Sequence, residues 1–92
     1  MVEETSLEAY FNIVEPLLSE KQVEVLRVFK MHTDRSFTNM ELADMLGWSI
    51  NRVTPRTNEL RKIGALKTVG KRFCRITGNT AFALELRIND PR

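Results

Sequence analysis

Two residue types that stabilise many small scaffolds are nearly missing from this 92-residue chain: cysteine and histidine each occur once, as Cys74 and His32. A lone cysteine cannot form a disulfide within the chain, and one cysteine with one histidine cannot supply the ligands of a structural zinc site. The same scarcity prevents a Ser/His/Asp or Cys/His catalytic set, and no phosphate-cradling glycine loop occurs. We therefore expect no metal, no cofactor and no enzymatic activity.

Long apolar runs are also absent. No stretch of roughly 18 or more apolar residues could span a bilayer. The first residues, MVEETSLEAY, are acidic, unlike the basic start of a signal peptide. We expect a soluble cytoplasmic protein that has no contact with membranes. The length predicts a single domain, residues 1–92, with one hydrophobic core.

The charges that are present are distributed unevenly. Residues 1–46 contain four Lys/Arg and nine Asp/Glu, whereas residues 47–92 contain ten Lys/Arg and three Asp/Glu. The small net charge of +2 therefore hides an acidic first half and a basic second half. A polyanion would be attracted to the second half, although a basic face can also be merely solvated.

Three segments begin with a helix-start signal, a Ser or Thr followed three residues later by Glu or Gln, at Thr5, Ser19 and Thr38. In this motif, side chains and backbone satisfy each other's unpaired donors. The first signal predicts a helix over residues 6–15 that Pro16 closes. The third predicts a helix that stops at Gly47, because glycine suits the left-handed position after a helix end.

The period of the apolar pattern changes after residue 65. The segments FCRIT and TAFALELRI alternate and flank the dipeptide GN, which predicts a hairpin with a two-residue type II′ turn. Pairing Thr77 with Thr80 would place Phe73 opposite Leu84 and Arg72 opposite Glu85. The residues that this register predicts on one face, against the helices, are Phe73, Phe82, Leu84 and Leu86.

The order helix, helix, tight turn, helix and hairpin resembles a winged helix-turn-helix. The segment ELADMLGWSINRV has the small residue, turn glycine and inward aliphatic of that family at Ala43, Gly47 and Val53. TNELRKIGAL looks like the end of the recognition helix in MarR-like regulators. The chain is also similar to small winged-helix proteins of phages and prophages. The implied fold is α+β, mainly α: a three-helix core with a C-terminal hairpin wing over residues 19–88, and an accessory N-terminal helix over residues 6–15.

The resemblance implies that the third core helix lies in the major groove of double-stranded DNA and that the hairpin runs beside it. Arginine can bind guanine, and asparagine adenine, through two hydrogen bonds. The expected base-reading residues are Asn51, Arg52, Arg56 and Asn58, with Thr54 and Pro55 also facing the groove. The expected backbone contacts are Ser49, Thr54, Thr57, Arg61 and Lys62 on the helix and Lys67, Lys71, Arg72 and Arg75 on the wing. A solvated helix and a charged hairpin are the alternative.

Because of Pro55, the sequence allows more than one starting residue for the third core helix. If Ser49 is the cap, Pro55 falls in the second turn, where it removes a hydrogen bond and disfavours helical geometry at Thr54. If Asn51 is the cap, only the first hydrogen bond is lost, and if Thr54 is the cap, none is lost. Two interpretations follow. Pro55 either shapes the end of the helix that would contact DNA, or it only marks where the helix starts.

The N-terminal helix needs a partner for its apolar stripe, which consists of Leu7, Tyr10, Phe11 and Val14. The partner is either the core of the same domain or the equivalent helix of a second copy. Regulators of the type that the chain resembles commonly dimerise through helices outside the DNA-reading unit. A two-fold homodimer would bind inverted half-sites about one helical turn apart.

The resulting expectation is a sequence-specific DNA-binding protein, a transcriptional regulator, phage-encoded by resemblance, located in the cytoplasm with the nucleoid. Two alternatives stay open. One is a winged-helix module that binds an acidic protein partner, since fold alone does not determine function. The other is a nonspecific DNA-binding accessory protein of phage replication or packaging.

Overall fold

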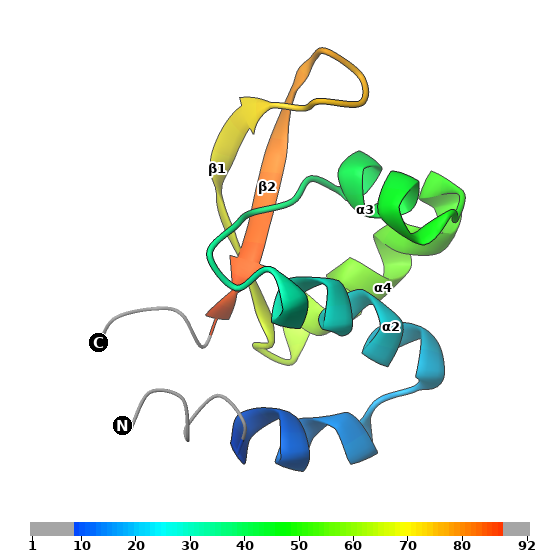
Figure 1. The fold of residues 1–92 in the computed structure, drawn as a ribbon, viewed down its shortest axis with the longest axis vertical. Coiled ribbons are helices and arrows are strands. Elements are labelled where there is room, and N and C mark those ends of the chain that lie inside the picture. The colour runs from blue at the N-terminus through cyan, green and yellow to red at the C-terminus, as the bar shows by residue number, and fades with distance from the viewer. Residues whose placement is uncertain (1–8, 88–92) are drawn as a thin grey trace.

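The computed structural model describes residues 9–87. A helical segment over residues 9–14, here the N-terminal helix, continues into a 3₁₀ turn, η1 (Glu15–Leu17), and is followed by α2 (Glu20–Met31), α3 (Asn39–Leu46) and α4 (Ile50–Lys62). Two antiparallel strands follow, β1 (Leu66–Phe73) and β2 (Thr80–Leu86). The base of this hairpin packs beside the helices and its tip projects beyond them (Figure 1). The predicted fold class, mainly α with winged-helix-like topology and an additional N-terminal helix, is confirmed.

Reciprocal side-chain capping determines where α2 and α3 begin, as the sequence predicts. Ser19 Oγ accepts a hydrogen bond from the Gln22 backbone N–H at 3.3 Å, and Gln22 Oε1 accepts one from the Ser19 N–H at 3.0 Å. Thr38 and Glu41 form the same pair at the start of α3, with both distances 3.1 Å. α3 ends at Gly47, whose φ of 71° is left-handed, a conformation that glycine adopts without strain.

α4 carries a proline in its interior. Of the three starts that the sequence allows, the structure has Ser49 as the cap residue, in extended conformation and without a side-chain capping bond. The alternatives at Asn51 and Thr54 are therefore wrong. Pro55 lies in the second turn, where it has no N–H to donate to the Asn51 carbonyl and where its ring crowds that turn. The packing of α4 holds the helix together despite this local loss.

The predicted register of the hairpin is wrong. Phe73 pairs with Thr80 and Arg72 with Ala81, rather than with Leu84 and Glu85. The connection between the strands is therefore residues 74–79, instead of the two residues of a type II′ turn. A β-bulge between Thr68 and Gly70 shifts the register once more towards the base.

Burial of Cys74 explains the longer connection. Its side chain is fully buried, so the chain turns inward at the residue where the predicted register would have continued the strand. The Cys74 N–H donates to the Asn79 carbonyl, and the Gly78 N–H donates to the Cys74 carbonyl, both at 2.9 Å. These bonds close a compact turn that satisfies its own backbone groups.

Only the base of the predicted apolar face of the hairpin reaches the core. Leu84 and Leu86 are 5% and 1% exposed, whereas Phe73 and Phe82 are 63% and 58% exposed. At the level of the two phenyl rings it is the other face of the hairpin, with Arg72, that contacts the start of α3. The prediction that all four residues pack against the helices is thus half wrong.

The core lies between α2, α3, α4 and the base of the hairpin. The segment before α3 joins the sheet at one point, where Phe37 and Leu84 exchange backbone hydrogen bonds of 2.9 and 2.8 Å. The Phe37 ring meets the Phe29 ring edge-to-face, with centroids 5.3 Å apart, a favourable aromatic geometry. Fully buried residues of this core include Val25, Leu26, Phe29, Phe37, Leu42, Val53, Leu60 and Leu66.

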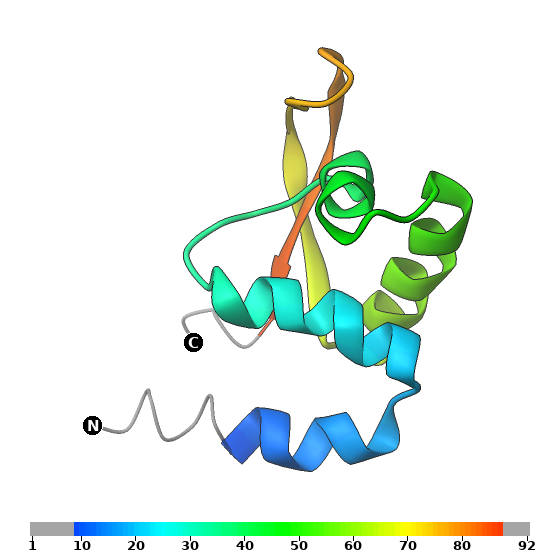
Figure 2. The ribbon, with the colours of Figure 1, turned by 45° about the vertical axis from the view of Figure 1, so that its right-hand side comes forward.

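The N-terminal helix lies alongside α2, on the side away from the hairpin tip (Figure 2). Phe11 is 1% exposed and belongs to the core, and the Lys30 ammonium lies 4.9 Å from the centroid of its ring. Tyr10 and Val14 are partly buried against the same core. The core of the same domain is therefore a partner for this stripe. The helix-start signal at Thr5 and the side chain of Leu7 lie outside the described residues.

Replacing Pro55 by Ala tests the cost of the interior proline. Because alanine restores an N–H donor to the Asn51 carbonyl and removes the ring, we expect Pro55→Ala to raise the free energy of unfolding by about 1 to 3 kcal/mol. The measurement is urea unfolding followed by circular dichroism. Asn58→Ala is the matched control, because it gains helix propensity of about 0.5 kcal/mol and loses only an exposed hydrogen bond from Arg61. An equal gain in both variants would contradict the interpretation.

Candidate nucleic-acid interface

α3, the turn at residues 47–49 and α4 form the helix-turn-helix unit. The Trp48 N–H donates to the Ala43 carbonyl at 3.0 Å, which ties the turn to α3. The Trp48 side chain packs partly buried against the core, and the Lys21 ammonium lies 5.2 Å from its ring. The tryptophan thus covers the core at the turn, and the angle between α3 and α4 is held by packing as well as by the turn.

The inward face of α4 holds the helix in place. Val53 and Leu60 are fully buried, and Thr57 between them is 1% exposed. The Thr57 hydroxyl donates to Asn39 Oδ1, at the start of α3, at 2.9 Å. We expected Thr57 to contact a DNA backbone, and we do not retain that role, because the helical period places residue 57 on the same side as residues 53 and 60. Thr57 instead fixes the rotation of α4 against α3.

The outward face of α4 is polar and carries no carboxylate. The exposed residues of α4 are Asn51, Arg52, Pro55, Asn58, Arg61 and Lys62. Of these, Asn51, Pro55, Asn58 and Lys62 fall on one stripe at spacings of four, three and four residues. The Arg61 guanidinium donates to Asn58 Oδ1 at 2.9 Å. Ser49 is exposed before the helix and Thr54 is half-buried on its flank.

Arg56 lies on the other flank of α4, towards α2. Its guanidinium donates to Glu59 Oε2 at 2.9 Å, and the Gln22 amide donates to Glu59 Oε1 at 2.7 Å. Gln22 also takes part in the capping of α2. Arg56 therefore links α4 to the start of α2, and it is 30% exposed at the side chain. We do not retain it among the proposed base-reading residues.

A groove of about 420 Å³ separates α4 from the hairpin. Its walls come from the start of α3, the C-terminal half of α4 and one face of the hairpin. None of the side chains that line it is a carboxylate. They are Asn39, Thr57, Asn58, Arg61, Thr68, Phe82 and Leu84. The groove thus offers amides, hydroxyls, one guanidinium and a phenyl ring.

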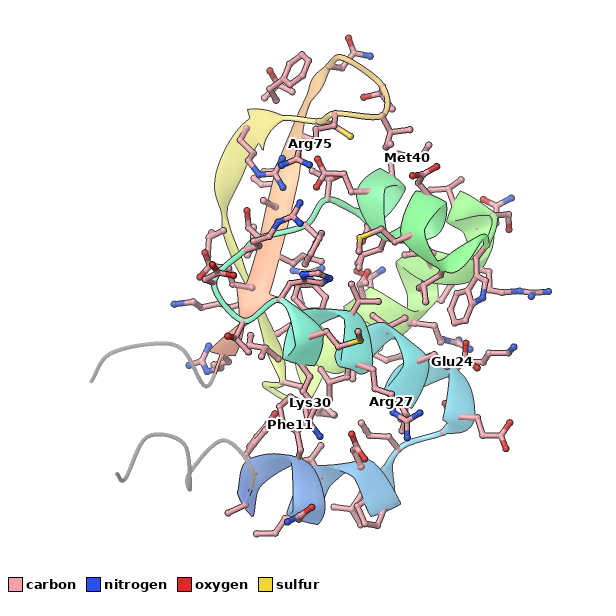
Figure 3. All side chains as sticks on the ribbon, in the orientation of Figure 1. Phe11, Glu24, Arg27, Lys30, Met40 and Arg75 are labelled. Carbon is pink, nitrogen blue, oxygen red and sulfur yellow. The ribbon has the colours of Figure 1, made fainter. Side chains whose placement is uncertain are left out.

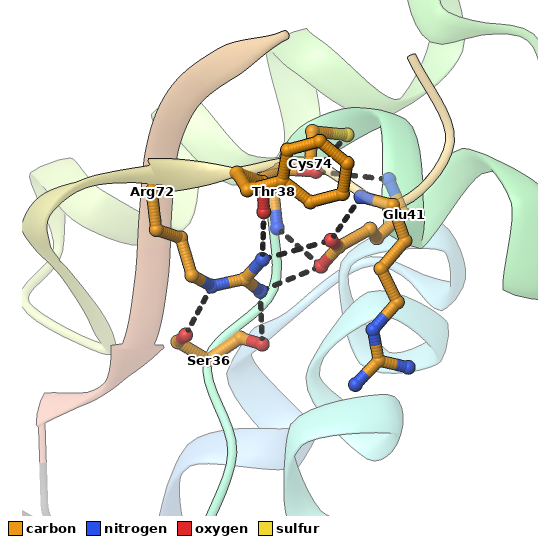
Figure 4. A network of polar contacts seen from close by, with 7 residues as sticks. Ser36, Thr38, Glu41, Arg72 and Cys74 are labelled. Carbon is orange, nitrogen blue, oxygen red and sulfur yellow. Dashed lines mark hydrogen bonds and ion pairs between the residues drawn. The ribbon is translucent and has the colours of Figure 1, made fainter. Parts of the chain in front are cut away.

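Arg72 joins the hairpin to the helix-turn-helix unit (Figure 4). Its guanidinium donates to both carboxylate oxygens of Glu41, at 2.7 and 2.9 Å, and to the Ser36 hydroxyl and carbonyl, at 3.0 and 2.7 Å. It also donates to the Phe73 carbonyl at 2.7 Å. We expected Arg72 to contact the DNA backbone. Because its donors bind groups of the fold, we do not retain that role for it.

The Glu41 carboxylate is the centre of this network. It is 7% exposed and accepts from the backbone N–H groups of Thr38 and Arg75, both at 3.1 Å, as well as from Arg72. The hydrogen bonds from Arg72 outweigh the effect of burial and lower the pKa of Glu41 from 4.5 to about 2. The capping motif identified Glu41 in the sequence. Its partner 31 residues further on had no sequence signal.

Cys74 borders the same network. Its Sγ is hydrogen-bonded to the Thr38 hydroxyl at 3.1 Å. Burial raises the pKa of the thiol, whereas hydrogen bonds from Thr38, Thr77 and Ile76 lower it, and together these effects lower the pKa to about 7. Cys74 therefore anchors the hairpin connection against the start of α3.

The other predicted wing residues occupy different faces of the hairpin. Lys71 is exposed, and its ammonium lies 5.1 Å from the centroid of the Phe82 ring, on the strand opposite. Lys67 lies opposite Glu85 near the base of the hairpin, and Arg75 is exposed in the connection at the tip. The structure therefore places Lys71 near the groove, and the DNA contacts of all three stay predictions.

An apolar groove of about 580 Å³ lies between the N-terminal helix and the end of α4. Tyr10 and Val14 line it, together with Leu17 and Ile63, which are 79% and 58% exposed. Burial raises the pKa of Tyr10. Of the predicted dimer residues, Phe11 is already covered by the core of its own domain, while Tyr10 and Val14 border this groove. The homodimer stays a prediction.

Comparison with known proteins finds no matching family model and no similar curated protein. Within residues 9–87, no group of three His, Cys, Asp or Glu side chains could hold a metal ion. No helix of this described part is long and apolar enough to cross a membrane. The features of this chain that bear on its function are the geometry of α4, the groove and the hairpin.

Replacing Glu41 by Gln tests the junction between hairpin and helices. Glutamine can still cap α3 but loses the charge that pairs with Arg72, so we expect the free energy of unfolding at pH 7 to fall by about 2 kcal/mol. Because folding lowers the pKa of Glu41, its contribution is present above pH 4.5 and is lost as the pH falls towards 2. The difference between wild type and Glu41→Gln should therefore shrink over that range.

The measurement is urea unfolding of both proteins at a series of pH values. Asp44→Asn is the control, because Asp44 is an exposed carboxylate on the same helix, and we expect it to change the stability by less than about 0.5 kcal/mol. A difference between wild type and Glu41→Gln that is the same at pH 7 and pH 2.5 would contradict the role of the charge.

Proposed function

We propose that this chain binds double-stranded DNA sequence-specifically and acts as a transcriptional regulator, with α4 in the major groove and the hairpin as a wing beside it. The observation that carries the proposal is the composition of the outward face of α4. Its exposed residues are asparagines, cations and a proline, and the one acidic residue of the helix, Glu59, is engaged with Arg56 and Gln22. A basic helix face without a free carboxylate can bind phosphate groups and base edges.

The candidates for base reading are Asn51, Asn58 and Arg52. Asparagine and arginine side chains on an exposed helix can each make two hydrogen bonds to a base edge. Arg61, Lys62 and Lys71 lie at the border of the groove or at the end of α4, where cations can contact phosphates. In this role the chain would resemble MarR-like regulators and the small winged-helix proteins of phages.

Charge-neutralising variants test phosphate binding by α4. Wild type should bind random-sequence duplex DNA with an affinity that falls steeply with salt, because binding releases counterions. Arg61→Gln and Lys62→Gln should each reduce the slope of log affinity against log salt by about one. Fluorescence anisotropy across a salt series measures this. Arg27→Gln is the matched control, because Arg27 is exposed on α2 and points towards the N-terminal helix (Figure 3).

The outcomes separate the alternatives. No binding at low salt would overturn the proposal and favour a protein-interaction module. An equal loss of slope in Arg27→Gln and Arg61→Gln would show an effect of net charge alone, and would also count against a role for α4.

A base-reading variant tests specificity. After selection of a preferred site from a random duplex library, Asn51→Ala should lose about 1 to 3 kcal/mol of discrimination at one base pair while it retains the salt slope. Competition binding against singly substituted sites measures this loss. A uniform loss over all sites would favour the nonspecific accessory protein instead.

A further inference from the structure

The hairpin carries two phenyl rings that its own fold leaves uncovered. Phe73 and Phe82 are 63% and 58% exposed, and they lie on the opposite face of the hairpin from Arg72, which is bound to the start of α3. In the strand register Lys71 is opposite Phe82 and Thr80 is opposite Phe73, so the two rings occupy diagonal positions on the same face. Large exposed apolar surface commonly marks a binding site.

This face of the hairpin is the one that turns towards α4. Leu84 and Leu86 lie on the same face at the base and are buried in the core. Phe82 follows them outward and lines the groove, together with Asn58 and Arg61 of α4. A ligand in the groove would therefore contact the exposed part of α4 and the Phe82 ring together.

The charges around the rings indicate which kind of ligand fits. The Lys71 ammonium lies 5.1 Å from the Phe82 centroid, and Arg61 lines the groove on the α4 side. The lining residues include no carboxylate. The Asn39 and Asn58 amides offer NH₂ donors, while their oxygens already accept from Thr57 and Arg61. This combination suits a flat, polar, aromatic group that carries a nearby negative charge. It suits an apolar peptide poorly, because such a segment would bury the cations without pairing them.

We propose that the face formed by Phe73, Phe82 and Lys71 is a site for a DNA base that has left the helical stack. The base stacks on Phe82, its polar edge faces the amides of the groove, and its phosphate lies beside Lys71 or Arg61. Aromatic side chains next to cations bind unstacked bases in this way regardless of sequence, and apolar wedges open base steps in bent duplexes. This inference rests on the proposed function and adds a preference for DNA that is kinked, bulged or melted beside the α4 site.

The test compares a fully paired duplex with the same duplex carrying one bulged nucleotide. Wild type should bind the bulged duplex about tenfold more tightly, since stacking of one base on an aromatic side chain contributes about that factor. Phe82→Ala should abolish the difference, and Phe82→Tyr, which retains the ring, should preserve it. Val69→Ala is the matched control, because Val69 is an exposed apolar residue of the same hairpin without a ring.

A second readout follows the base itself. With 2-aminopurine at the bulged position, its fluorescence should change on binding of wild type and of Phe82→Tyr, but not on binding of Phe82→Ala. Circular dichroism of each variant verifies that the fold is retained. If Phe82→Ala is unfolded, the wild type alone keeps the proposal falsifiable, because equal binding of the two duplexes would overturn it.

The outcomes distinguish this inference from the proposed function. Salt-dependent binding of the paired duplex that Arg61→Gln weakens, without any preference for the bulged duplex, would overturn the base site and leave the DNA-binding proposal standing. Equal weakening of both duplexes by Phe82→Ala would also overturn it, because the ring would then contact paired DNA. Binding of neither duplex would overturn both. Loss of self-association in Phe82→Ala, with no effect on DNA, would assign the face to a second copy and overturn the base site.

Discussion

The ion pair between Glu41 and Arg72 holds the hairpin to the helix-turn-helix unit. The carboxylate caps α3 from within, at the third position of the helix, and binds both terminal nitrogens of an arginine on β1. A buried carboxylate without these partners would be strongly destabilising. The same arginine binds the Ser36 carbonyl in the segment before α3. One side chain thus sets where the hairpin lies relative to α3 and, through α3, relative to α4.

The orientation of α4 depends on contacts from two sides. The Thr57 hydroxyl binds Asn39 of α3, and Glu59 connects Arg56 to Gln22 of α2. These contacts place Asn51, Asn58 and Lys62 outward, and Arg61 beside the groove. Under the proposed function, a face of α4 that is held by several directed hydrogen bonds would need little reorganisation on binding, which favours specific recognition.

Pro55 illustrates how packing overrides local preference. Local rules favour a helix start at Asn51 or Thr54, where the proline would be tolerated best. The helix nevertheless begins after Ser49. A start at Thr54 would leave Val53 outside the helix, whereas Val53 and Leu60 are both fully buried on one face of the observed helix. Burial of two aliphatic side chains outweighs one lost hydrogen bond. The proline stays on the exposed side of the helix.

The helix starts at Ser19 and Thr38, the end at Gly47 and the order of elements follow from the sequence alone, because capping and apolar periodicity are local properties of the chain. The sequence did not determine the hairpin register, in which Cys74 is drawn into the core, nor the roles of Arg72, Arg56 and Thr57. Arg72 and Thr57 bind Glu41 and Asn39, which are 31 and 18 residues away. Arg56 binds Glu59, which in turn accepts from Gln22, 37 residues from Glu59. Only the tertiary structure brings such partners together, because nothing in the spacing of two distant residues records whether their side chains meet.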